Sequence, residues 1–577
     1  MSIRVPSRLC AVAAAVMMFA APVTAQEKVD TATIARIKMM ALDSSQVMTI
    51  MSWMTDVYGS RLTWSPNVAK AGDWAMTTMK SWGLANVHSE PWYVPNALGW
   101  ANERFSFQAL APVPFIIEAV PRAWSTSAKM AVVGKGKVAA NAPAKVTGPA
   151  IRVQAGCLSE LKANYAGKLT NAFILATAPS EVPVTEFNAF ASRLSDSALY
   201  NLSFPAPGGG RGAFGAGRGG AATPPVLSAI CQQEAAAAPP PPTPPAGGRG
   251  GGRGGFNVTS DTASLRWLEG QKVGAILLGG RGGGYIGGNI ATDNGVPRVK
   301  GYPQVPYVHV ATESYGRIAR MLAKGVTPTL ELEMQNHFYP ADTTSFNYIG
   351  EIPGTDPVLK DEVVMIGGHF DSWHSGTGAT DNAAGSAVMM EVMRILKALN
   401  LQPRRTIRIG LWTGEEQGIY GSREYVAKHY GTTAAPLDEH KKFAAYFNVD
   451  NGSGKIRGVY LQGMEAERAI FDQWMEPFKA MGMKALTINN TGGTDHLSFA
   501  TNAGLPGFQF IQDGLDYGSR THHTNQDVYE RVQPDDMKFN AAVVASFAWQ
   551  AAQRDEKLPR PLPTPSATGR GGRGGGM

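Results

Sequence analysis

The residues of this chain that could do chemistry are histidines and acids that follow apolar runs. They lie in VVMIGGHFDSW (363–373), GATDNAAGSA (378–387), TIRIGLWTGEEQG (406–418), AAYFNVDNG (444–452) and SRTHHTNQD (519–527). The candidates are His369, Asp371, Asp381, Glu415, Glu416, Asp450, His522 and His523. Imidazole nitrogens and carboxylate oxygens are ligands for divalent metals such as zinc. The set is large enough for two metals with one carboxylate left for proton transfer, which predicts a hydrolase.

The positions of these residues indicate one edge of a sheet. His369, the pair Glu415 and Glu416, and Asp450 each come after an apolar run that reads as a strand, and His523 lies beyond GFQFIQ. In open α/β sheets, ligands gather beyond the carboxyl ends of the strands. Any one of these residues alone has an ordinary structural reading, such as a helix N-cap for an aspartate. Their recurrence at the same kind of position favours a metal site.

The spacing of apolar residues predicts an α/β fold. From residue 345 onward, apolar strands alternate with amphipathic helices, which is typical of a mostly parallel mixed sheet with helices on both faces. Short β-rich runs with Gly and Pro between them fill 102–200 instead. We therefore expect a catalytic α/β domain that is interrupted by a smaller β-rich domain.

The expected organisation has five parts. They are a signal peptide at 1–25, the first part of the catalytic domain at 26–101, the inserted β-rich domain at 102–340, the main catalytic part at 341–558, and a tail at 559–577. A low-complexity Arg/Gly/Pro stretch at 205–255 interrupts the inserted domain. This stretch and the tail cannot bury enough apolar surface to offset their chain entropy, so both are predicted to be disordered.

The N-terminus predicts export. Arg4 and Arg8 precede a short apolar run at 9–21, and small residues lead up to Gln26. This is the pattern of a cleaved signal peptide, and no apolar run is long enough to span a bilayer. We expect a secreted or periplasmic protein without stable membrane insertion. The two cysteines left after processing, Cys157 and Cys231, could form one disulfide, and the sequence leaves their pairing open.

The positive charge says little about partners. The formal net charge is +7, and many of the arginines lie in Gly-rich tracts rather than in the predicted folded parts. Such tracts can bind single-stranded RNA, but in an exported chain a flexible linker is the simpler reading. No nucleic-acid partner is expected.

Several motifs together resemble the co-catalytic di-zinc exopeptidases, the zinc aminopeptidase and carboxypeptidase Q-like family. They are GGHFDSW, TDNAAGSA, LWTGEEQGIYGS, NVDNG, GGTDHLSFATNAGLPG and HHTNQDVYERV, with YGSRLTWSP and WGLANV near the N-terminus. The resemblance omits the signal, the 205–255 stretch and the tail. It implies the zinc-peptidase fold, and it implies that the inserted unit resembles a protease-associated domain, which can limit access to the cleft.

The same resemblance implies two Zn²⁺ per chain and indicates which residues would bind each ion. His369 and Asp450 would bind one zinc, Asp381 would bridge both, and Glu416 and His523 would bind the second. The family histidine is followed by a short polar stretch and an acid, and His523 fits this spacing.

The remaining candidates receive supporting roles. The resemblance makes Glu415 the general base and then the general acid. Asp371, close to the first histidine ligand, could hold that imidazole N–H. Asp495 and His496 match a family element and are expected in the pocket wall or behind the ligands, as is His522.

The leading hypothesis is an exported zinc exopeptidase acting on short peptides, with aminopeptidase or dipeptidase activity favoured and carboxypeptidase Q-like activity as the alternative. A glutaminyl-cyclase-like acyltransferase, which would use one zinc, stays open. So does a non-catalytic protein that binds through its Arg/Gly-rich segments. The sequence also leaves a homodimer open.

Overall fold

A computed structural model describes most of the chain. The described residues are 27–95, 97–129, 144–180, 189–204, 228–237, 256–280, 287–292, 294–340 and 343–560. The predicted signal peptide, most of the 205–255 stretch and nearly all of the predicted tail lie outside them.

Within the described residues the first sheet has eight strands, and it carries the catalytic motifs. In spatial order they are β1 (Ala85–Tyr93), β10 (Thr344–Ile352), β12 (Thr406–Trp412), β11 (Val363–His369), β13 (Phe443–Asn448), β16 (Gly507–Gln512), β14 (Ile456–Tyr460) and β15 (Ala485–Thr487). The central strands β12, β11, β13 and β16 are parallel, and antiparallel pairs flank them. Every residue of β11 is buried, as expected for a parallel strand covered on both faces. The predicted mixed α/β class is confirmed.

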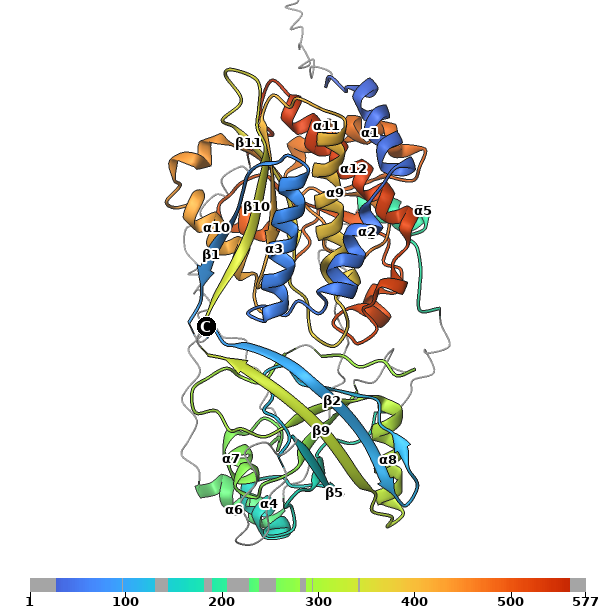
Figure 1. Cartoon of the computed structure of the whole chain (residues 1–577), viewed down its shortest axis with the longest axis vertical. Helices are drawn as coiled ribbons and strands as arrows, with labels where there is room; N and C mark the ends of the chain where they lie inside the picture. Colours follow the sequence, from blue (N-terminus) through green and yellow to red (C-terminus); the bar gives the residue numbers. More distant parts are fainter. Residues whose placement is uncertain are drawn as a thin grey trace, which may run out of the picture.

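Helices cover both faces of this sheet (Figure 1). One face packs against a large apolar core with α1 (Thr31–Asp43), α2 (Val47–Ser52), α3 (Pro66–Ser81), α9 (Ala384–Ala398), α11 (Arg468–Lys479) and α12 (Pro534–Gln553). The other face carries α10 (Tyr420–His429) over a smaller aromatic cluster that includes Trp412 and Tyr446. Among the described helices, none has the length and apolar character needed to cross a membrane.

Short π- or 3₁₀-helical turns connect several elements. They are η1 (Trp53–Val57), η3 (Ala379–Ala383), η4 (Asp438–Lys442), η5 (Glu465–Glu467), η6 (Ser498–Asn502), η7 (Tyr517–Thr521) and η8 (Tyr529–Arg531).

Strand β1 is an element that the sequence did not predict. The helical N-terminal part ends at a turn through Gly83, whose φ is +78°, and the chain then pairs with β10 in antiparallel register. The residues of β1 are mostly polar or only half-buried because it is an edge strand. The alternation of apolar and polar residues that identifies a strand is therefore weak.

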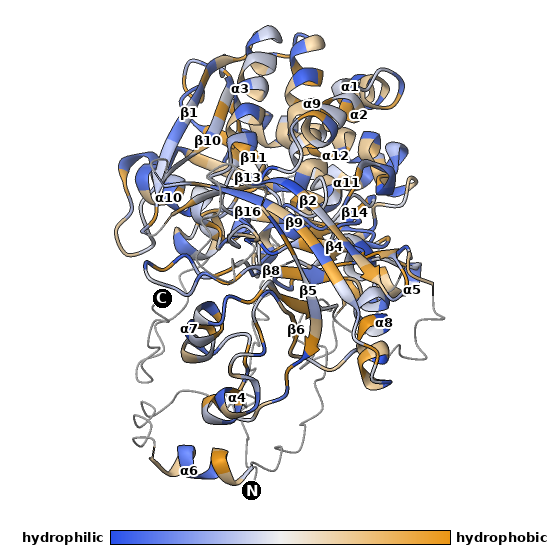
Figure 2. Ribbon diagram, turned by 60° about the horizontal axis from the view of Figure 1, so that its bottom comes forward, coloured by the Kyte–Doolittle hydropathy of each residue, from blue (hydrophilic) through white to orange (hydrophobic). Residues whose placement is uncertain are grey.

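The second sheet is built from the chain between β1 and β10 and fills the lower half of Figure 1. Its described strands, in spatial order, are β3 (Phe115–Ile116), β2 (Gly99–Ala111), β9 (Thr329–Tyr339), β5 (Lys145–Arg152), β6 (Phe173–Leu175), β7 (Ala275–Gly279), β8 (Tyr307–Val310) and β4 (Ala119–Pro121). Figure 2 shows hydrophilic and hydrophobic residues along the long β2–β9 pair, consistent with one buried and one exposed face. We call the segment from β2 to β9 the inserted unit. Its likeness to a protease-associated domain stays a prediction.

The inserted unit also carries helices, and its two cysteines are joined. The helices are α4 (Leu158–Tyr165), α6 (Ala229–Ala237), α7 (Thr262–Gly270) and α8 (Thr312–Ala323), while α5 (Asp196–Ser203) packs on β15 of the first sheet. Cys157 and Cys231 form a disulfide between α4 and α6. Helix α6 lies where the sequence predicted disorder. The disulfide and a hydrogen bond from the Ser159 backbone N–H to Glu234 Oε2 (2.8 Å) hold it in place.

Candidate metal centre

The central parallel strands bring the candidate residues together at their carboxyl ends. His369 is the last residue of β11, Glu415 and Glu416 follow β12, and Asp450 follows β13. Asp381 lies in η3, just before α9. This is the edge of the sheet that the sequence indicated.

Asp381 stands between two groups of ligand atoms. Its Oδ1 lies 3.2 Å from His369 Nε2, which is also 3.2 Å from Asp450 Oδ1. Its Oδ2 lies 3.3 Å from His523 Nε2, which is 2.9 Å from Glu416 Oε2. One carboxylate thus presents one oxygen to each group.

The donor set fits zinc. Zinc takes nitrogen and oxygen ligands at roughly 2.0–2.2 Å, so tetrahedral ligand atoms lie about 3.3–3.6 Å apart. Ligand atoms of His369, Asp381 and Asp450 all lie within 4.8 Å of one another. Asp381 Oδ2 is buried and makes no hydrogen bond. A buried acceptor without a donor is rare and calls for an explanation, and a cation at this point provides one.

The two neighbouring histidines are placed differently. The side chain of His523 is 24% exposed, and it lies close to both Glu416 and Asp381. The side chain of His522 is 47% exposed, its Nε2 is 3.7 Å from Asp381 Oδ2, and its ring packs on Tyr517. The preference for His523 as the ligand stays a prediction that this arrangement favours.

The electrostatics of the centre also suit a cation. Burial lowers the pKa of His369, but Asp450 and the other surrounding carboxylates outweigh it and raise that pKa well above its ordinary value. Burial raises the pKa of Glu416 well above its ordinary value, and the negative charge of Asp381 adds to this. Carboxylates crowded in a buried site repel one another, so positive charge brought among them is favourable.

Glu415 is held through its backbone by Asp371. The Glu415 backbone N–H donates to Asp371 Oδ1 (3.3 Å), and Asp371 Oδ2 accepts from the Thr63 hydroxyl (2.7 Å). The Glu415 carboxylate makes no hydrogen bond or ion pair with a described residue. Burial raises its pKa well above the ordinary value, and the charges of Asp450 and other nearby acids add to this.

The contact between Asp371 and His369 differs from the one that the sequence suggested. His369 Nδ1 lies 3.1 Å from the backbone carbonyl oxygen of Asp371 and 3.6 Å from its carboxylate. The carbonyl therefore holds the imidazole, since the carboxylate is occupied by Thr63 and by the loop that carries Glu415.

Asp495 and His496 are fully buried. Burial raises the pKa of Asp495 to about 7 and lowers that of His496 to about 4, and the charge of Asp495 contributes to the raised pKa of Glu415. Their predicted supporting role remains a prediction.

Two residues that support the centre received no role from the sequence. Asp527 accepts hydrogen bonds from the Thr380 backbone N–H (2.6 Å), the Thr380 hydroxyl (2.8 Å) and the Asp381 N–H (3.2 Å), which fixes the loop of the shared aspartate. Arg61 is fully buried. It donates to the carbonyls of Phe370, Thr377 and Gly378, which all lie in the loop after β11. Arg61 belongs to the motif YGSRLTWSP and Asp527 to HHTNQD. The spacing of residues within these motifs gave no indication of the contacts.

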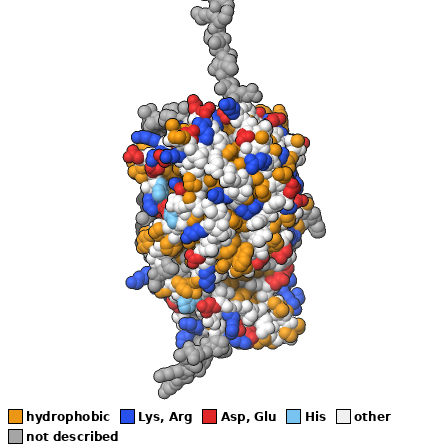
Figure 3. Space-filling model, turned by 45° about the horizontal axis from the view of Figure 1, so that its top comes forward, with side chains coloured by type: hydrophobic (Ala, Val, Ile, Leu, Met, Phe, Trp, Pro, Cys, Tyr) orange, Lys and Arg blue, Asp and Glu red, His pale blue; other side chains and the backbone are white. Residues whose placement is uncertain are grey.

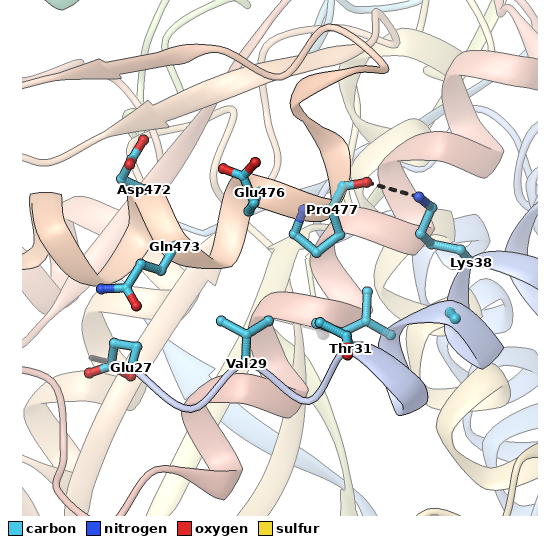
Figure 4. Close-up of a pocket in the computed structure, with 10 residues that line it drawn as sticks. Glu27, Val29, Thr31, Lys38, Asp472, Gln473, Glu476 and Pro477 are labelled. Carbon is cyan, nitrogen blue, oxygen red and sulfur yellow. Dashed lines mark hydrogen bonds between the residues drawn. The ribbon is translucent and has the colours of Figure 1, made fainter. Parts of the chain in front are cut away.

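A cavity of about 420 Å³ adjoins the centre where the inserted unit meets the first sheet. It is lined by Pro95, Trp124, residues 294–299, Trp373, Glu416 and Gln417. A second cavity of about 850 Å³ lies between the N-terminal segment and α11, where Lys38 donates to the Pro477 carbonyl (Figure 4). None of the metal-centre residues lines the second cavity, so the first is the candidate substrate site.

Comparisons with known proteins agree with this geometry. Residues 347–548 match the model of Peptidase family M28. Carboxypeptidase Q of Mus musculus is 34% identical over 260 residues, which cover 45% of this chain and 53% of that protein. Leupeptin-inactivating enzyme 1 of Streptomyces exfoliatus is 31% identical over 185 residues, covering 32% of this chain and 38% of that protein. The chain spans about half the length, or less, of these curated relatives in the matches.

The fold is shared over a greater length. A solved Peptidase M28 precursor from Shewanella amazonensis SB2B superposes with a TM-score of 0.60 at 22% identity, covering 92% of this chain and 98% of that one. The likeness therefore includes the inserted unit.

The fold and the region that carries the metal centre are thus similar to those of M28 peptidases. The matched residues, 347–548, include every proposed metal ligand.

Proposed function

We propose that the protein is an exported exopeptidase that binds two zinc ions and hydrolyses a terminal peptide bond of short peptides. The observation that carries the proposal is the sharing of Asp381 between two groups of ligand atoms, with an unengaged glutamate beside them. The first zinc would be held by His369 and Asp450, and the second by Glu416 and His523.

The chemistry follows from these positions. Zinc held there would polarise the peptide carbonyl and lower the pKa of a water molecule. Glu415 would accept the proton of the attacking water at a carboxylate oxygen and deliver it to the leaving amine. Asp371 keeps Glu415 in place through the backbone of the loop, and so acts as a positioning residue.

Aminopeptidase or dipeptidase activity is favoured, and carboxypeptidase activity is the alternative. The metal ligands do not distinguish cleavage at the N-terminus from cleavage at the C-terminus. They would act on the scissile bond and not on the ends of the peptide. The relative carboxypeptidase Q is named for the carboxypeptidase direction, which is why that alternative is kept.

The test is turnover of a panel of short peptides, with free and blocked termini, by the zinc-loaded mature protein and by Glu415→Gln. We expect wild-type cleavage of one terminal bond, and we expect the variant to lose about 10²–10⁴-fold in kcat with unchanged zinc content. No turnover of any peptide by a protein that holds two zinc ions would refute the exopeptidase proposal.

Two alternatives have their own outcomes. One zinc per chain together with cyclisation of N-terminal glutamine would indicate the cyclase-like acyltransferase. A protein without turnover that binds polyanions through its Arg/Gly-rich segments would indicate the binding protein. On the face shown in Figure 3, positive and negative side chains are interspersed, which does not favour a nucleic-acid surface.

A further inference from the structure

The hairpin between β2 and β3 exposes apolar side chains at one end of the inserted unit. Residues 110–116 read LAPVPFI and include no charged residue. Within this hairpin Leu110 is 39% exposed, Val113 is 53% exposed and Ile116 is 81% exposed. Val326, which lies just before the neighbouring strand β9, is 38% exposed as well. Single apolar side chains at a surface are normal, but a group of them on one hairpin indicates an interaction site.

A basic helix face lies beside the hairpin. Helix α8 and its C-terminal end carry Arg317, Arg320 and Lys324, which are exposed and whose spacing places them on one side of the helix. The Arg317 Cζ lies 3.8 Å from the ring centroid of Phe115, which joins this face to the hairpin. Figure 1 shows α8 next to the ends of β2 and β9 that lie away from the first sheet. None of the three cations forms an ion pair with a residue that the structure describes.

The acids near the hairpin do not cancel this charge. Glu118 and Glu313 lie at the first turn of α8, at the opposite end of the helix from Lys324. Two acids of β9 are already engaged in ion pairs of 2.9 Å, namely Glu331–Lys145 and Glu333–Arg104. The surface formed by the hairpin and the C-terminal half of α8 therefore combines exposed apolar side chains with positive charge.

We propose that this surface, the hairpin 110–116 with the basic face of α8, binds peripherally to an anionic phospholipid bilayer. The apolar side chains would enter the boundary between headgroups and acyl chains, and the cations would lie level with the phosphates. Pro112 and Pro114 have no backbone N–H, which lowers the cost of taking this stretch of backbone out of water. Such binding leaves the protein on the membrane surface without spanning it. The proposal goes beyond the peptidase activity and does not depend on it.

A second copy of the chain fits the hairpin less well than a lipid surface does. Pro112 and Pro114 interrupt the backbone donors that another strand would need for pairing at this edge. A stable dimer buries about 800 Å² on each partner, which is more than the exposed side chains of one short hairpin provide. In a two-fold contact through this surface the basic faces of both copies would also meet and repel each other.

Sedimentation of the mature protein with vesicles tests the proposal. One set of vesicles contains phosphatidylcholine alone, and the other contains phosphatidylcholine mixed with phosphatidylglycerol. We expect wild type to bind the anionic vesicles at least about 10-fold more tightly than the neutral ones. Val113→Ser combined with Ile116→Ser should weaken binding to the anionic vesicles by about 10-fold or more, because less apolar surface would leave water.

The basic face is tested by a second pair of substitutions. Arg320→Gln combined with Lys324→Gln should weaken binding to the anionic vesicles by about 10–30-fold and leave binding to neutral vesicles unchanged. The matched control is Val358→Ser combined with Lys360→Gln, at an 82% exposed valine and an exposed lysine before β11, and it should behave as wild type. All these substitutions are at exposed positions, so the unfolding temperature should stay that of wild type.

A fluorescent probe reports on insertion directly. After removal of Cys10 with the expected signal peptide, the remaining Cys157 and Cys231 are joined in a disulfide, so Ile116→Cys supplies a thiol for a polarity-sensitive dye. The emission of this dye should shift to shorter wavelength on anionic vesicles, because the side chain at this position would leave water. The same dye on Val358→Cys should show no shift.

Three results would overturn the proposal. Wild type that sediments with neither kind of vesicle does not bind a bilayer. Vesicle binding that both double variants retain at the level of the control uses another surface. A concentration-dependent dimer that is lost in the Val113→Ser and Ile116→Ser variant, from a protein that does not bind vesicles, assigns the hairpin to a second copy. None of these measurements needs peptide cleavage, so failure of the proposed peptidase function is distinguished from failure of membrane binding.

Discussion

At the scale of single residues, Asp381 is the residue on which both groups of ligand atoms depend. We predict that Asp381→Asn lowers the zinc content of the protein by about two ions per chain, because a neutral amide would weaken both proposed sites. Asp450→Asn should lower it by about one, since Asp450 lies in one group only. Metal analysis after dialysis against a zinc buffer measures both.

The matched control is Asp527→Asn, which changes a buried carboxylate that holds the same loop without being a proposed ligand. It should reduce zinc affinity less than Asp381→Asn does. Retention of the wild-type zinc content by Asp381→Asn would contradict a shared ligand.

The sequence indicated these candidate residues because they follow apolar runs at the ends of predicted strands, and the family resemblance supplied their roles as ligands. It did not predict the roles of Arg61 and Asp527. Arg61 and Asp527 act mainly on backbone groups of distant segments. Such contacts exist only once the chain has folded, so residue type and local spacing do not reveal them.

At the scale of elements, Glu90 joins the edge strand β1 to helix α10. Its carboxylate lies 2.8 Å from His429 Nε2 and 2.9 Å from Lys428 Nζ. Although burial opposes it, these hydrogen bonds lower the pKa of Glu90 to about 2. A carboxyl group whose pKa is lower in the folded state stabilises the fold above its ordinary pKa of roughly 4.5, and this contribution is lost as the pH falls toward 2.

We therefore predict that Glu90→Gln lowers the free energy of unfolding by about 1–2 kcal/mol at pH 7. The difference from wild type should stay constant down to about pH 5 and shrink below it. Urea unfolding at a series of pH values measures it, with Glu424→Gln, at an exposed glutamate of α10, as the control. A difference that grows as the pH falls would have the wrong sign.

The elements themselves were predicted unevenly. Strands β11, β12, β13 and β16 are mainly apolar, although β12 and β16 contain polar residues, and helix α9 has a clear apolar stripe, so local pattern was sufficient for them. Strand β1 is polar at an edge, and α6 is a short helix in a low-complexity stretch that depends on a disulfide. In both cases tertiary contacts, and not local sequence, decide the structure.

At the scale of the whole molecule, residues of the inserted unit and of the region around the first sheet line one cavity beside the metal centre. In this cavity Arg298 of the inserted unit stacks on two tryptophans, one from the inserted unit and one from the region around the first sheet. The sequence pattern predicted that a unit is inserted, and the family resemblance implied that it can limit access to the cleft. The position of this cation could be identified only from the fold, because residues 294–299 have no recognisable motif.

Metal binding should stabilise the whole molecule, because the centre brings several buried carboxylates close together and zinc would relieve their repulsion. Zinc in excess of its dissociation constant by about 100-fold would add about 2.7 kcal/mol per site. We predict that chelation lowers the Tm of wild type by at least about 5 °C and that added zinc restores it. Glu415→Gln should show the same shift, since Glu415 is not a proposed ligand, whereas Asp381→Asn should show little of it. Differential scanning calorimetry of the three proteins, with and without a chelator, measures these shifts, and an unchanged wild-type Tm would mean that the cluster does not bind zinc tightly enough to support the proposed chemistry.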